Sequence, residues 1–566
     1  MQSLQRTPGS GAAPGGRAAL RRRAAAAVVR GQRERTTRAR TASAAAEQGA
    51  APGGSGKNVV VIGGGWAGFG AAKHLSEQGY SVTLLEASLN PGGLSGGFRT
   101  KEGKVVEAGM KGFWYEYKNL FRLIRELGIP WPLTDWTTSG FWSPKGLTTE
   151  APVFSRQQQL PTLMGQFVHT SGLQWSLPLE ERLTMLPFLT TLLDYNSSPE
   201  VFESYDRMSA RDLCRQWGMS ERMYNEFLRP TLLVGLFAPP EDISAAVMLE
   251  TLEFYALGHQ NNFDVCWPKG SIAELIFKPM VDRIEASGGV IAGGRLVVDV
   301  VAGGPGGGLS EVRARNVTTG EVESYPADAV VSAIGITGFQ KLVSSCPALA
   351  ARPELRAAMN LRGIDVIATR LWFDKKVDCR FPANVLAGFE RTAGATFFDL
   401  NALQDEYKDA PGSVVTADFY GASELLPLSD DEIVARAQAH IAVCEPGFGD
   451  AKVVDSAVLR FRQAVTHFSP GSHASRPYQA TSIPNLFIAG DWVKGVDHGA
   501  NGLSQERAYV TGLIAANLVV SKLGQGSPAE ILDVEKDEPH IEAGRAAVST
   551  LRSLVGGLGI KSPFMQ

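Results

Sequence analysis

Several features that would point to a function are scarce or absent in this chain of 566 residues. Its five cysteines are scattered without a C-x-x-C pair, which argues against a disulfide framework and against a thiolate zinc site. Its eight histidines lack the spacing of a metal-binding motif, so we expect no metal. No apolar run approaches the roughly 20 residues that a membrane-spanning helix needs. A formal net charge of −3 makes a general nucleic-acid binder a poor hypothesis, and we expect no nucleic-acid partner.

Lysine is absent from the first fifty residues, and acidic residues are rare there. Ten arginines stand against only Glu34 and Glu47, among many alanines, glycines, serines and threonines. This composition is typical of an organelle transit peptide, which we predict for residues 1–50; a disordered basic tail is the alternative. It does not separate mitochondrial from plastid leaders. The net charge of this segment is +8 and that of the whole chain is −3, so the rest of the chain has a net charge of −11.

A strand–helix–strand pattern follows this leader. Residues 57–62 form a short apolar run rich in valine, which predicts a buried parallel strand. Residues 71–78 have helical character and are followed by Gly79, and residues 81–86 predict a second strand. Together they predict a βαβ unit.

Glycines occupy the turn after the first strand, in the pattern Gly63-x-Gly65-x-x-Gly68. Such glycines allow a tight turn, the close approach of a pyrophosphate and close packing of helix on strand, and the helix N-terminus offers free N–H groups to phosphate. Glu86 ends the second strand, where its carboxylate can accept hydrogen bonds from ribose hydroxyls. The acid would repel a 2′-phosphate, which disfavours NADP and leaves NAD and FAD open.

The remainder of the chain predicts further elements of an α/β protein. We expect one helix over residues 119–127 and another over 505–520. Three strands around a glycine-rich turn look antiparallel, and three apolar runs look like buried strands. The antiparallel strands are expected at 296–301, 311–317 and 322–325, and the buried ones at 329–333, 364–373 and 486–489.

Three more segments complete a recognisable pattern. Pro91-Gly92-Gly93 follows Glu86 closely, Gly490-Asp491 follows the last strand, and the last helix begins at Ser504. With the first glycine turn, this pattern resembles the flavin amine oxidase superfamily, in which the second turn passes the FAD pyrophosphate, the aspartate bonds the ribitol chain and the last helix points at flavin N1 and O2. Within it, plastid phytoene and ζ-carotene desaturases look most similar. The similar stretches are residues 107–119, 269–284, 364–376 and 483–512.

The resemblance implies FAD as cofactor and an α/β fold. A Rossmann-like FAD-binding domain, discontinuous in sequence, would carry an inserted α+β substrate domain. The FAD-binding domain would comprise residues 57–130, 261–345 and 479–524, and the substrate domain residues 131–260 and 346–478. Residues 525–566 form a tail to which neither the residues nor the resemblance assigns a role.

The resemblance also implies which residues lie at the cofactor. They would contact its adenosine half, its pyrophosphate or its flavin. The implied residues are Gly63, Gly65, Ala67, Gly68, Glu86, Ala87, Gly92, Gly93, Leu94, Lys111, Gly112, Tyr117, Val297, Gly490, Asp491 and Gln505. Four positions depart from the family pattern and mark a divergent paralogue: Ser88 and Leu275 replace arginine, Leu94 replaces a basic residue and Arg507 replaces glycine. We expect Arg507 to be a surface residue of its helix.

By the same resemblance, the reaction would be the dehydrogenation of a hydrophobic isoprenoid or polyene, with hydride transfer to flavin N5 and a quinone as acceptor. A proton must also leave the adjacent carbon, and the candidates that could accept it are Lys111, Glu506 and the flavin. An amine oxidase is the second hypothesis. It is disfavoured because strand 364–373 has no lysine and no aromatic residue directly precedes the last helix. A redox-silent or isomerising plastid flavoprotein is the third hypothesis.

Residues 131–193 are rich in tryptophan, leucine and phenylalanine, which indicates either an ordinary core or an apolar pocket that opens on a membrane. A water-insoluble substrate favours the second, so we expect a monotopic protein attached to a lipid surface through this region. The resemblance makes the plastid, and its internal membranes, the expected location. The aromatic residues concerned are Trp131, Trp136, Phe141, Trp142 and Trp175.

Overall fold

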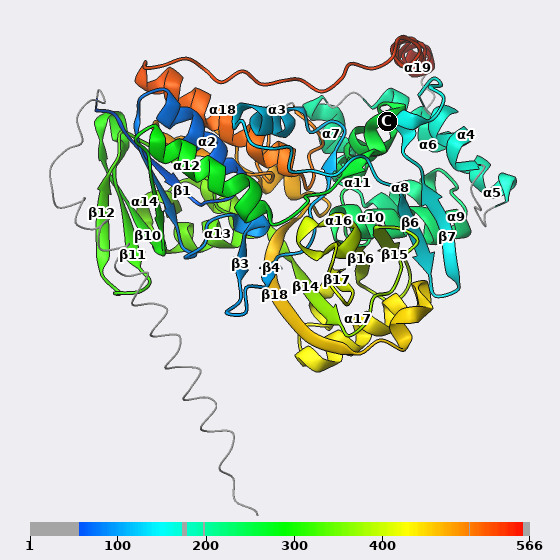
Figure 1. Cartoon of the computed structure of the whole chain (residues 1–566). Coiled ribbons are helices and arrows are strands. Elements are labelled where there is room, and N and C mark those ends of the chain that lie inside the picture. Colours follow the sequence, from blue (N-terminus) through cyan, green and yellow to red (C-terminus); the bar gives the residue numbers. More distant parts are fainter. Residues whose placement is uncertain (1–55, 163, 172–177, 196–197, 497, 558–566) are drawn as a thin grey trace, which may run out of the picture. The chain divides into compact units, whose positions relative to one another are not determined.

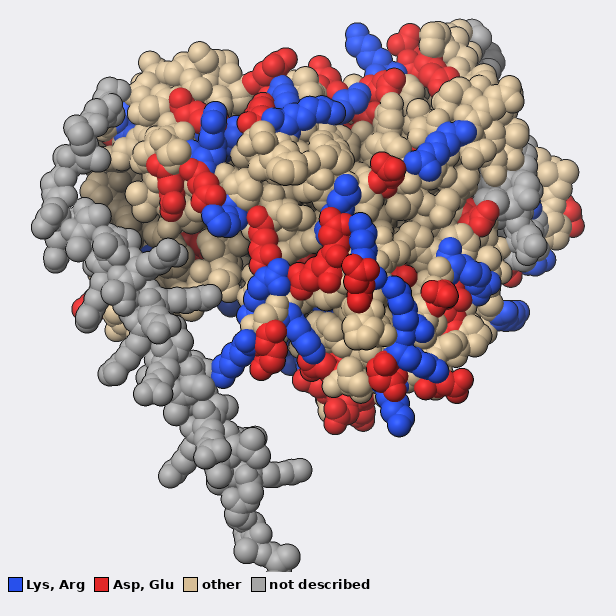
Figure 2. Space-filling view, in the orientation of Figure 1, with Lys and Arg blue, Asp and Glu red and all other residues tan. Residues whose placement is uncertain are grey.

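The computed structural model describes residues 56–162, 164–171, 178–195, 198–496 and 498–557. The expected leader, residues 1–50, and Trp175 lie outside the described residues. Among the described helices, none combines the length and the apolar character that crossing a membrane requires. Lysine and arginine side chains alternate with acidic ones over the face in Figure 2, and many are paired, as Arg99 is with Glu274 at 2.6 Å.

A five-stranded parallel sheet forms the first layer of the fold (Figure 1). Val61, on its central strand, is in register with Leu84 on one side and with Val331 on the other. Both faces of the sheet are covered, which explains why its strands are short apolar runs. Its strands come from distant parts of the chain, which confirms a discontinuous Rossmann-like domain. In spatial order they are β19 (Leu486–Ile488), β13 (Ala329–Ser332), β1 (Asn58–Ile62), β2 (Ser81–Glu86) and β9 (Val290–Gly293).

Different elements cover the two faces of this sheet. Val59 and Val61 belong to a core built with three helices, whereas Val60 and Ile62 belong to a core built with a small antiparallel sheet. The helices are α2 (Trp66–Glu77), α12 (Lys278–Ala286) and α18 (Gln505–Leu523), which lie together in Figure 1. The small sheet is β10 (Arg295–Gly304), β11 (Gly308–Asn316) and β12 (Val322–Pro326), three antiparallel strands as the sequence predicted. Helix α13 (Ile336–Ser345), which the sequence did not predict, lies beside it.

The start of α2 differs from the prediction. The helix begins at Trp66, so that Gly68 and Gly70 lie in its first turns rather than in a loop before Ala71. Glycine is unfavourable in a helix interior, which is why the sequence pattern placed the start too late. Gly68 is required by its surroundings, because a Cβ there would lie 1.8 Å from the carbonyl oxygen of Gly63.

A seven-stranded mixed sheet forms the second part of the fold. Its strands come from both segments that were assigned to the substrate domain, and β15 pairs with β6 in parallel while the other pairs are antiparallel. In spatial order they are β18 (Val453–His467), β14 (Arg362–Phe373), β17 (Val414–Tyr420), β16 (Gly394–Asp399), β15 (Ala383–Leu386), β6 (Ser139–Ser143) and β7 (Gly146–Ala151).

Helices complete this α+β unit. One packs on the sheet with the core around Ile367 and Val415, and several others form a separate helical core with Ile364 and Tyr420. The first is α17 (Asp430–Cys444); the others include α6 (Leu186–Asp194), α7 (Pro199–Asp206), α8 (Ala210–Gln216), α10 (Arg229–Leu236) and α11 (Ala245–Leu252). The inserted α+β architecture is thereby confirmed.

The tail beyond α18 is a strap across the molecule (Figure 1). It begins beside α2, where the hydroxyl of Tyr80 donates to the carbonyl of Gln525 at 2.5 Å. Farther along, the N–H of Leu532 donates to the side chain of Asn119 at 2.8 Å. It ends in α19 (Pro539–Gly557), which packs on α6. The tail, to which the sequence assigned no role, therefore joins the parallel-sheet unit to the helical core.

Candidate cofactor and active site

The two glycine turns meet at the carboxyl ends of β1 and β2. The N–H of Gly92 donates to the carbonyl of Gly64 at 2.6 Å. A Cβ on Gly93 would lie 3.1 Å from the Cα of Gly65, so the two turns are in close backbone contact. The turns leave the N-terminus of α2, with its unpaired first-turn N–H groups, as a site for an anion. The structure thus brings together the glycines that the sequence predicted at the pyrophosphate.

Glu86 is fixed beside the first glycine turn. Its carboxylate accepts hydrogen bonds from the N–H groups of Gly64 and Ser88, each at 2.7 Å. It is only partly buried, so its carboxylate remains accessible to a further hydrogen-bond donor such as a ribose hydroxyl. The neighbouring Ala87 and Leu94 are exposed, and Val297 lies on β10, the edge strand that contacts β2.

Gln505, the first residue of α18, joins the halves of the site. Its Oε1 accepts a hydrogen bond from the indole N–H of Trp66 at 3.0 Å, and its Nε2 donates to the carbonyl of Gly112 at 3.0 Å. The hydroxyl of Ser95, in the second glycine turn, also donates to Oε1, at 3.3 Å. Segments separated by up to 439 residues therefore converge on one side chain.

Helix α18 packs against α2 close to this point. A Cβ on Gly512 would lie 2.1 Å from the carbonyl oxygen of Ala67, so only glycine allows the two helices to approach as they do. Ala67 therefore contributes to this helix contact as well as offering its N–H at the start of α2.

Asp491 follows β19 at the other end of the site. The preceding N–H, of Gly490, donates to the hydroxyl of Thr511 at 2.9 Å, which fixes the turn. The hydroxyl of Thr466 donates to the Asp491 carboxylate at 3.4 Å. Burial raises the pKa of Asp491 to about 6, and the nearby guanidinium groups of Arg507 and Arg476 oppose that rise.

These features fit FAD. The glycine turns and the start of α2 suit a pyrophosphate, the Glu86 carboxylate suits an adenosine ribose, and a mostly buried Asp491 carboxylate suits the hydroxyls of a ribitol chain.

Lys111 lies in a buried charged cluster that sequence reasoning did not find. Its ammonium group donates to the carbonyls of Ala108 and Gly109 at 2.5 and 3.3 Å. The carboxylate of Asp418, on β17, lies against Gly109, where a Cβ would approach it to 2.5 Å. Burial lowers the pKa of Lys111, which Asp418 and Glu107 oppose, and burial raises the pKa of Asp418 to about 6. An acid at a buried position of an otherwise apolar strand was the signal that could have pointed to Asp418.

Glu506 has a different role from the one considered for it. Its carboxylate accepts hydrogen bonds from the backbone N–H groups of Asn119 and Leu120 at 2.8 and 2.9 Å, and from the Asn119 side chain at 2.7 Å. These residues begin α3 (Lys118–Glu126), and Glu506 is fully buried. It therefore caps a helix, and its bonds to these N–H donors argue against the hypothesis of a catalytic Glu506.

Tyr117, which precedes α3, is also committed to a hydrogen-bond network. Its hydroxyl lies 3.0 Å from that of Tyr255, which in turn donates to the carbonyl of Leu503 at 3.1 Å. Ser504, which caps α18, donates to Tyr117 at 3.5 Å. Tyr117 thus lies beside the start of α18, as the resemblance implied.

Arg507 is buried, not a surface residue as expected. It is 0% exposed, and its guanidinium points back into the loop between β19 and α18. The sequence did not indicate this burial. Arg507 is simply the third residue after the capping Ser504, and the carbonyls that accept its hydrogen bonds belong to the preceding loop rather than to the helix.

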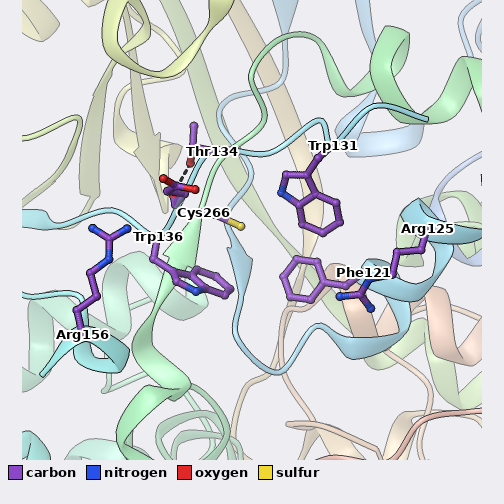
Figure 3. Close-up of a pocket in the computed structure, with 8 residues that line it drawn as sticks. Phe121, Arg125, Trp131, Thr134, Trp136, Arg156 and Cys266 are labelled. Carbon is purple, nitrogen blue, oxygen red and sulfur yellow. Dashed lines mark hydrogen bonds between the residues drawn. The ribbon is translucent and has the colours of Figure 1, made fainter. Parts of the chain in front are cut away.

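Two cavities lie beyond the glycine turns. The larger, of about 620 Å³, is lined by described residues of the loop before α18, by α7 and α11, and by the tail, and it includes carboxylates and histidines. Its ionisable residues are Glu116, Glu250, Glu253, His259, His473, His498, Glu535 and Asp537. The smaller, of about 220 Å³, is apolar and lies among Phe121, Trp131 and Trp136, with Arg125 and Arg156 on either side (Figure 3).

Comparison with known proteins agrees with this geometry. Residues 66–520 match the family described as flavin containing amine oxidoreductase. The chain is 25% identical over 76% of its length to a Synechococcus elongatus protein named "Probable zeta-carotene desaturase", covering 93% of it. It is 24% identical over 81% of its length to the 15-cis-phytoene desaturase of the same species, covering 95% of that protein. It is 23% identical over 81% of its length to the chloroplastic/chromoplastic 15-cis-phytoene desaturase of Solanum lycopersicum, covering 76% of it.

Solved structures share the fold. Cyclohexylamine oxidase from Brevibacterium oxydans superposes with a TM-score of 0.60 at 16% identity, covering 83% of this chain and 99% of that one. A putrescine oxidase superposes with a TM-score of 0.59 at 15% identity, covering 82% and 99%. The chain belongs to the flavin-containing amine oxidoreductase family, as a carotene-desaturase-like member and an FAD-dependent oxidoreductase.

Proposed function

We propose that the protein dehydrogenates a hydrophobic isoprenoid or polyene, with a quinone as electron acceptor. The observation that carries the proposal is the similarity to the phytoene and ζ-carotene desaturases of Synechococcus elongatus over almost the full length of those proteins. FAD, when bound, supplies a hydride acceptor at flavin N5. The chain must then bind the cofactor, exclude water and accept one proton.

The chain's own residues can meet these requirements. Gln505 ties the turns of the cofactor site to Gly112, which holds the segment around Lys111 in place. Aromatic rings enclose that region, with Trp114 and Tyr255 at 5.2 Å between centroids. Because Glu506 caps α3, Lys111 is the protein residue that remains a candidate to accept the proton, and its lowered pKa favours the neutral amine that a base requires.

A protonated amine is the second candidate substrate, favoured by the larger cavity. Glu116 and Asn262 line it, and Glu116 Oε1 and Asn262 Oδ1 are buried without a hydrogen-bond partner among the described residues. Buried acceptors of this kind suit a ligand with N–H donors, whereas a polyene would leave them unsatisfied. The absence of lysine from β14 argues in the other direction.

Product analysis separates the two candidates. The FAD-loaded protein is incubated with phytoene or ζ-carotene in detergent micelles and a soluble quinone, and separately with a panel of amines. We expect longer conjugated products, seen as red-shifted absorption after chromatography, and no amine turnover. Lys111→Met should abolish product while Lys278→Met, on an exposed face of α12, should not. Aldehyde and peroxide formed from an amine, with no polyene product, would favour the second candidate.

We also propose that the protein binds a lipid surface through the region around the smaller cavity (Figure 3). Trp131, which lines this cavity, is 43% exposed. Farther along the sequence, α4 (Met164–Ser171) and α5 (Leu179–Leu183) carry exposed Met164 and Leu179. Arg125 and Arg156 form no ion pair among the described residues and are available to lipid phosphates. Each large apolar side chain that enters the bilayer contributes roughly 1.5–3 kcal/mol, so a few suffice for reversible attachment. Plant relatives named chloroplastic support a location on internal plastid membranes.

Membrane extraction tests this attachment. The protein should resist high salt and be released by mild detergent, because burial of apolar side chains is not screened by salt. Trp131→Glu with Leu179→Glu should move it to the soluble fraction, while Leu89→Glu, an exposed leucine at the adenosine side, should not. Release by salt alone would contradict the proposal.

A further inference from the structure

Two buried arginines meet in the loop between β19 and α18. Arg476 is 2% exposed and Arg507 is 0% exposed. Both donate to the carbonyl of Val493, at 2.9 and 3.1 Å, and to the side-chain oxygen of Asn501, at 3.1 and 2.7 Å. They therefore lie against each other and share acceptors at both ends of one loop.

Arg507 is at the centre of that loop. Besides the two shared acceptors, it donates to the carbonyls of Asp491, Val496 and His498 at 3.1, 3.3 and 3.0 Å. These bonds to described residues use all three guanidinium nitrogens, and four of them go to backbone carbonyls of the same loop. Charge-assisted bonds are about twice as strong as neutral ones, so this one side chain dictates the path of residues 491–501.

The same loop forms part of two sites. It begins at Asp491, on the ribitol side of the cofactor site, and leads to Gln505, which ties both glycine turns together. Between them, Val496, His498 and Asn501 line the larger cavity. Loss of the loop's shape would therefore disturb the cofactor site and the cavity together.

We infer that Arg507 is a positioning residue that fixes the described residues of segment 491–501 as the shared wall of the FAD site and the larger cavity. Its role depends on FAD binding and not on the identity of the substrate.

The contacts of Asp491 add a pH-dependent readout of this position. The Nε of Arg507 donates to the backbone carbonyl of Asp491 at 3.1 Å, and the hydroxyl of Thr466, on β18, donates to its carboxylate at 3.4 Å. Burial raises the pKa of Asp491, while Arg507 and then Arg476 lower it. Removal of Arg507 should therefore let Asp491 protonate at a higher pH.

Two substitutions separate shape from charge. Arg507→Lys keeps the charge with fewer donors, and Arg507→Gln removes the charge. We expect FAD affinity at pH 8 to fall about 10-fold in the first and about 100-fold in the second. We also expect FAD affinity to fall as the pH is lowered from 8 to 5. In Arg507→Gln this fall should begin at a higher pH than in wild type, whereas in Arg507→Lys it should not. Hydrogen exchange of residues 491–501 should accelerate in both, measured in the FAD-loaded protein.

Controls keep the inference open to refutation. Arg211→Gln removes another buried guanidinium, which contacts Glu221 in the helical core, and should change neither FAD affinity nor exchange in the loop. If Arg507→Gln does not fold, Asn501→Ala, which removes the acceptor shared by both arginines, should still accelerate exchange. Wild-type affinity and exchange in both Arg507 variants would overturn the positioning role.

Discussion

The Glu506 carboxylate accepts hydrogen bonds from both the backbone and the side-chain N–H of Asn119, at 2.8 and 2.7 Å. The pair joins the start of α18 to the start of α3, two helices that lie 387 positions apart in sequence. An anion at a helix N-terminus satisfies unpaired donors and interacts favourably with the helix dipole. This explains why a fully buried acid is present where the fold needs no catalytic group.

Glu506→Gln should therefore reduce stability rather than alter the chemistry. The amide keeps one acceptor but loses the charge and places an N–H beside other N–H donors, so we expect a loss of about 1.5–3 kcal/mol in the free energy of unfolding. Thermal unfolding of the FAD-loaded protein measures it. Unchanged stability together with a collapse in turnover would restore Glu506 as a catalytic group.

Glu86→Ala should weaken FAD binding by about 100-fold or more, measured by fluorescence titration. The carboxylate holds the N–H groups of Gly64 and Ser88 and would lose its bonds to a ribose, each worth about 1.5–3 kcal/mol. Asp282→Ala, an exposed acid of α12, is the control and should leave affinity unchanged.

The FAD should be released into the supernatant by acid precipitation, because we expect no covalent attachment. A yellow pellet would refute that expectation.

Gly512→Ala should destabilise the protein by about 1–3 kcal/mol or prevent folding, because the added methyl would lie 2.1 Å from the carbonyl oxygen of Ala67. Gly235→Ala, in α10, is the matched control: no atom lies within 4 Å of its added Cβ, and it should be neutral or stabilising by about 0.4–1 kcal/mol. Equal unfolding temperatures for the two variants would show that the α2–α18 contact is looser than described.

Asp418 should give stability a specific pH dependence. Burial raises its pKa from 3.8 to about 6, so the folded state favours the protonated form. Its contribution to stability is then fully present below about pH 4 and lost as the pH rises through 6, a change of about 3 kcal/mol. Unfolding of wild type and Asp418→Asn is compared from pH 4 to pH 7. The wild type should lose stability relative to the variant across this window, and a constant difference would refute the assignment.

The sequence predicted the elements and residues whose roles depend on a local pattern. It did not predict the roles of residues whose partners are distant in sequence. The glycines at 63, 65 and 68 and the acid at 86 announce a nucleotide turn because each requirement lies within one βαβ unit. Alternating and apolar runs likewise predicted β10 to β13 within a few residues. Arg507 and Glu506 could not be interpreted in this way, because their roles are set by a loop and a helix brought to them by the fold. Asp418 lies 307 positions from Lys111, and only the sheet brings the two together.

The central claim, that this FAD-dependent oxidoreductase acts on a polyene, is tested most directly by an anaerobic half-reaction. Purified FAD-loaded protein is mixed with phytoene or ζ-carotene in micelles, without any acceptor, and the visible absorbance of the flavin is followed. We predict bleaching by a polyene, no bleaching by amines, and recovery of the colour on addition of a quinone. No bleaching by any polyene, from a flavin that dithionite reduces fully, would contradict the account, and bleaching by an amine instead would assign the protein to the other branch of its family.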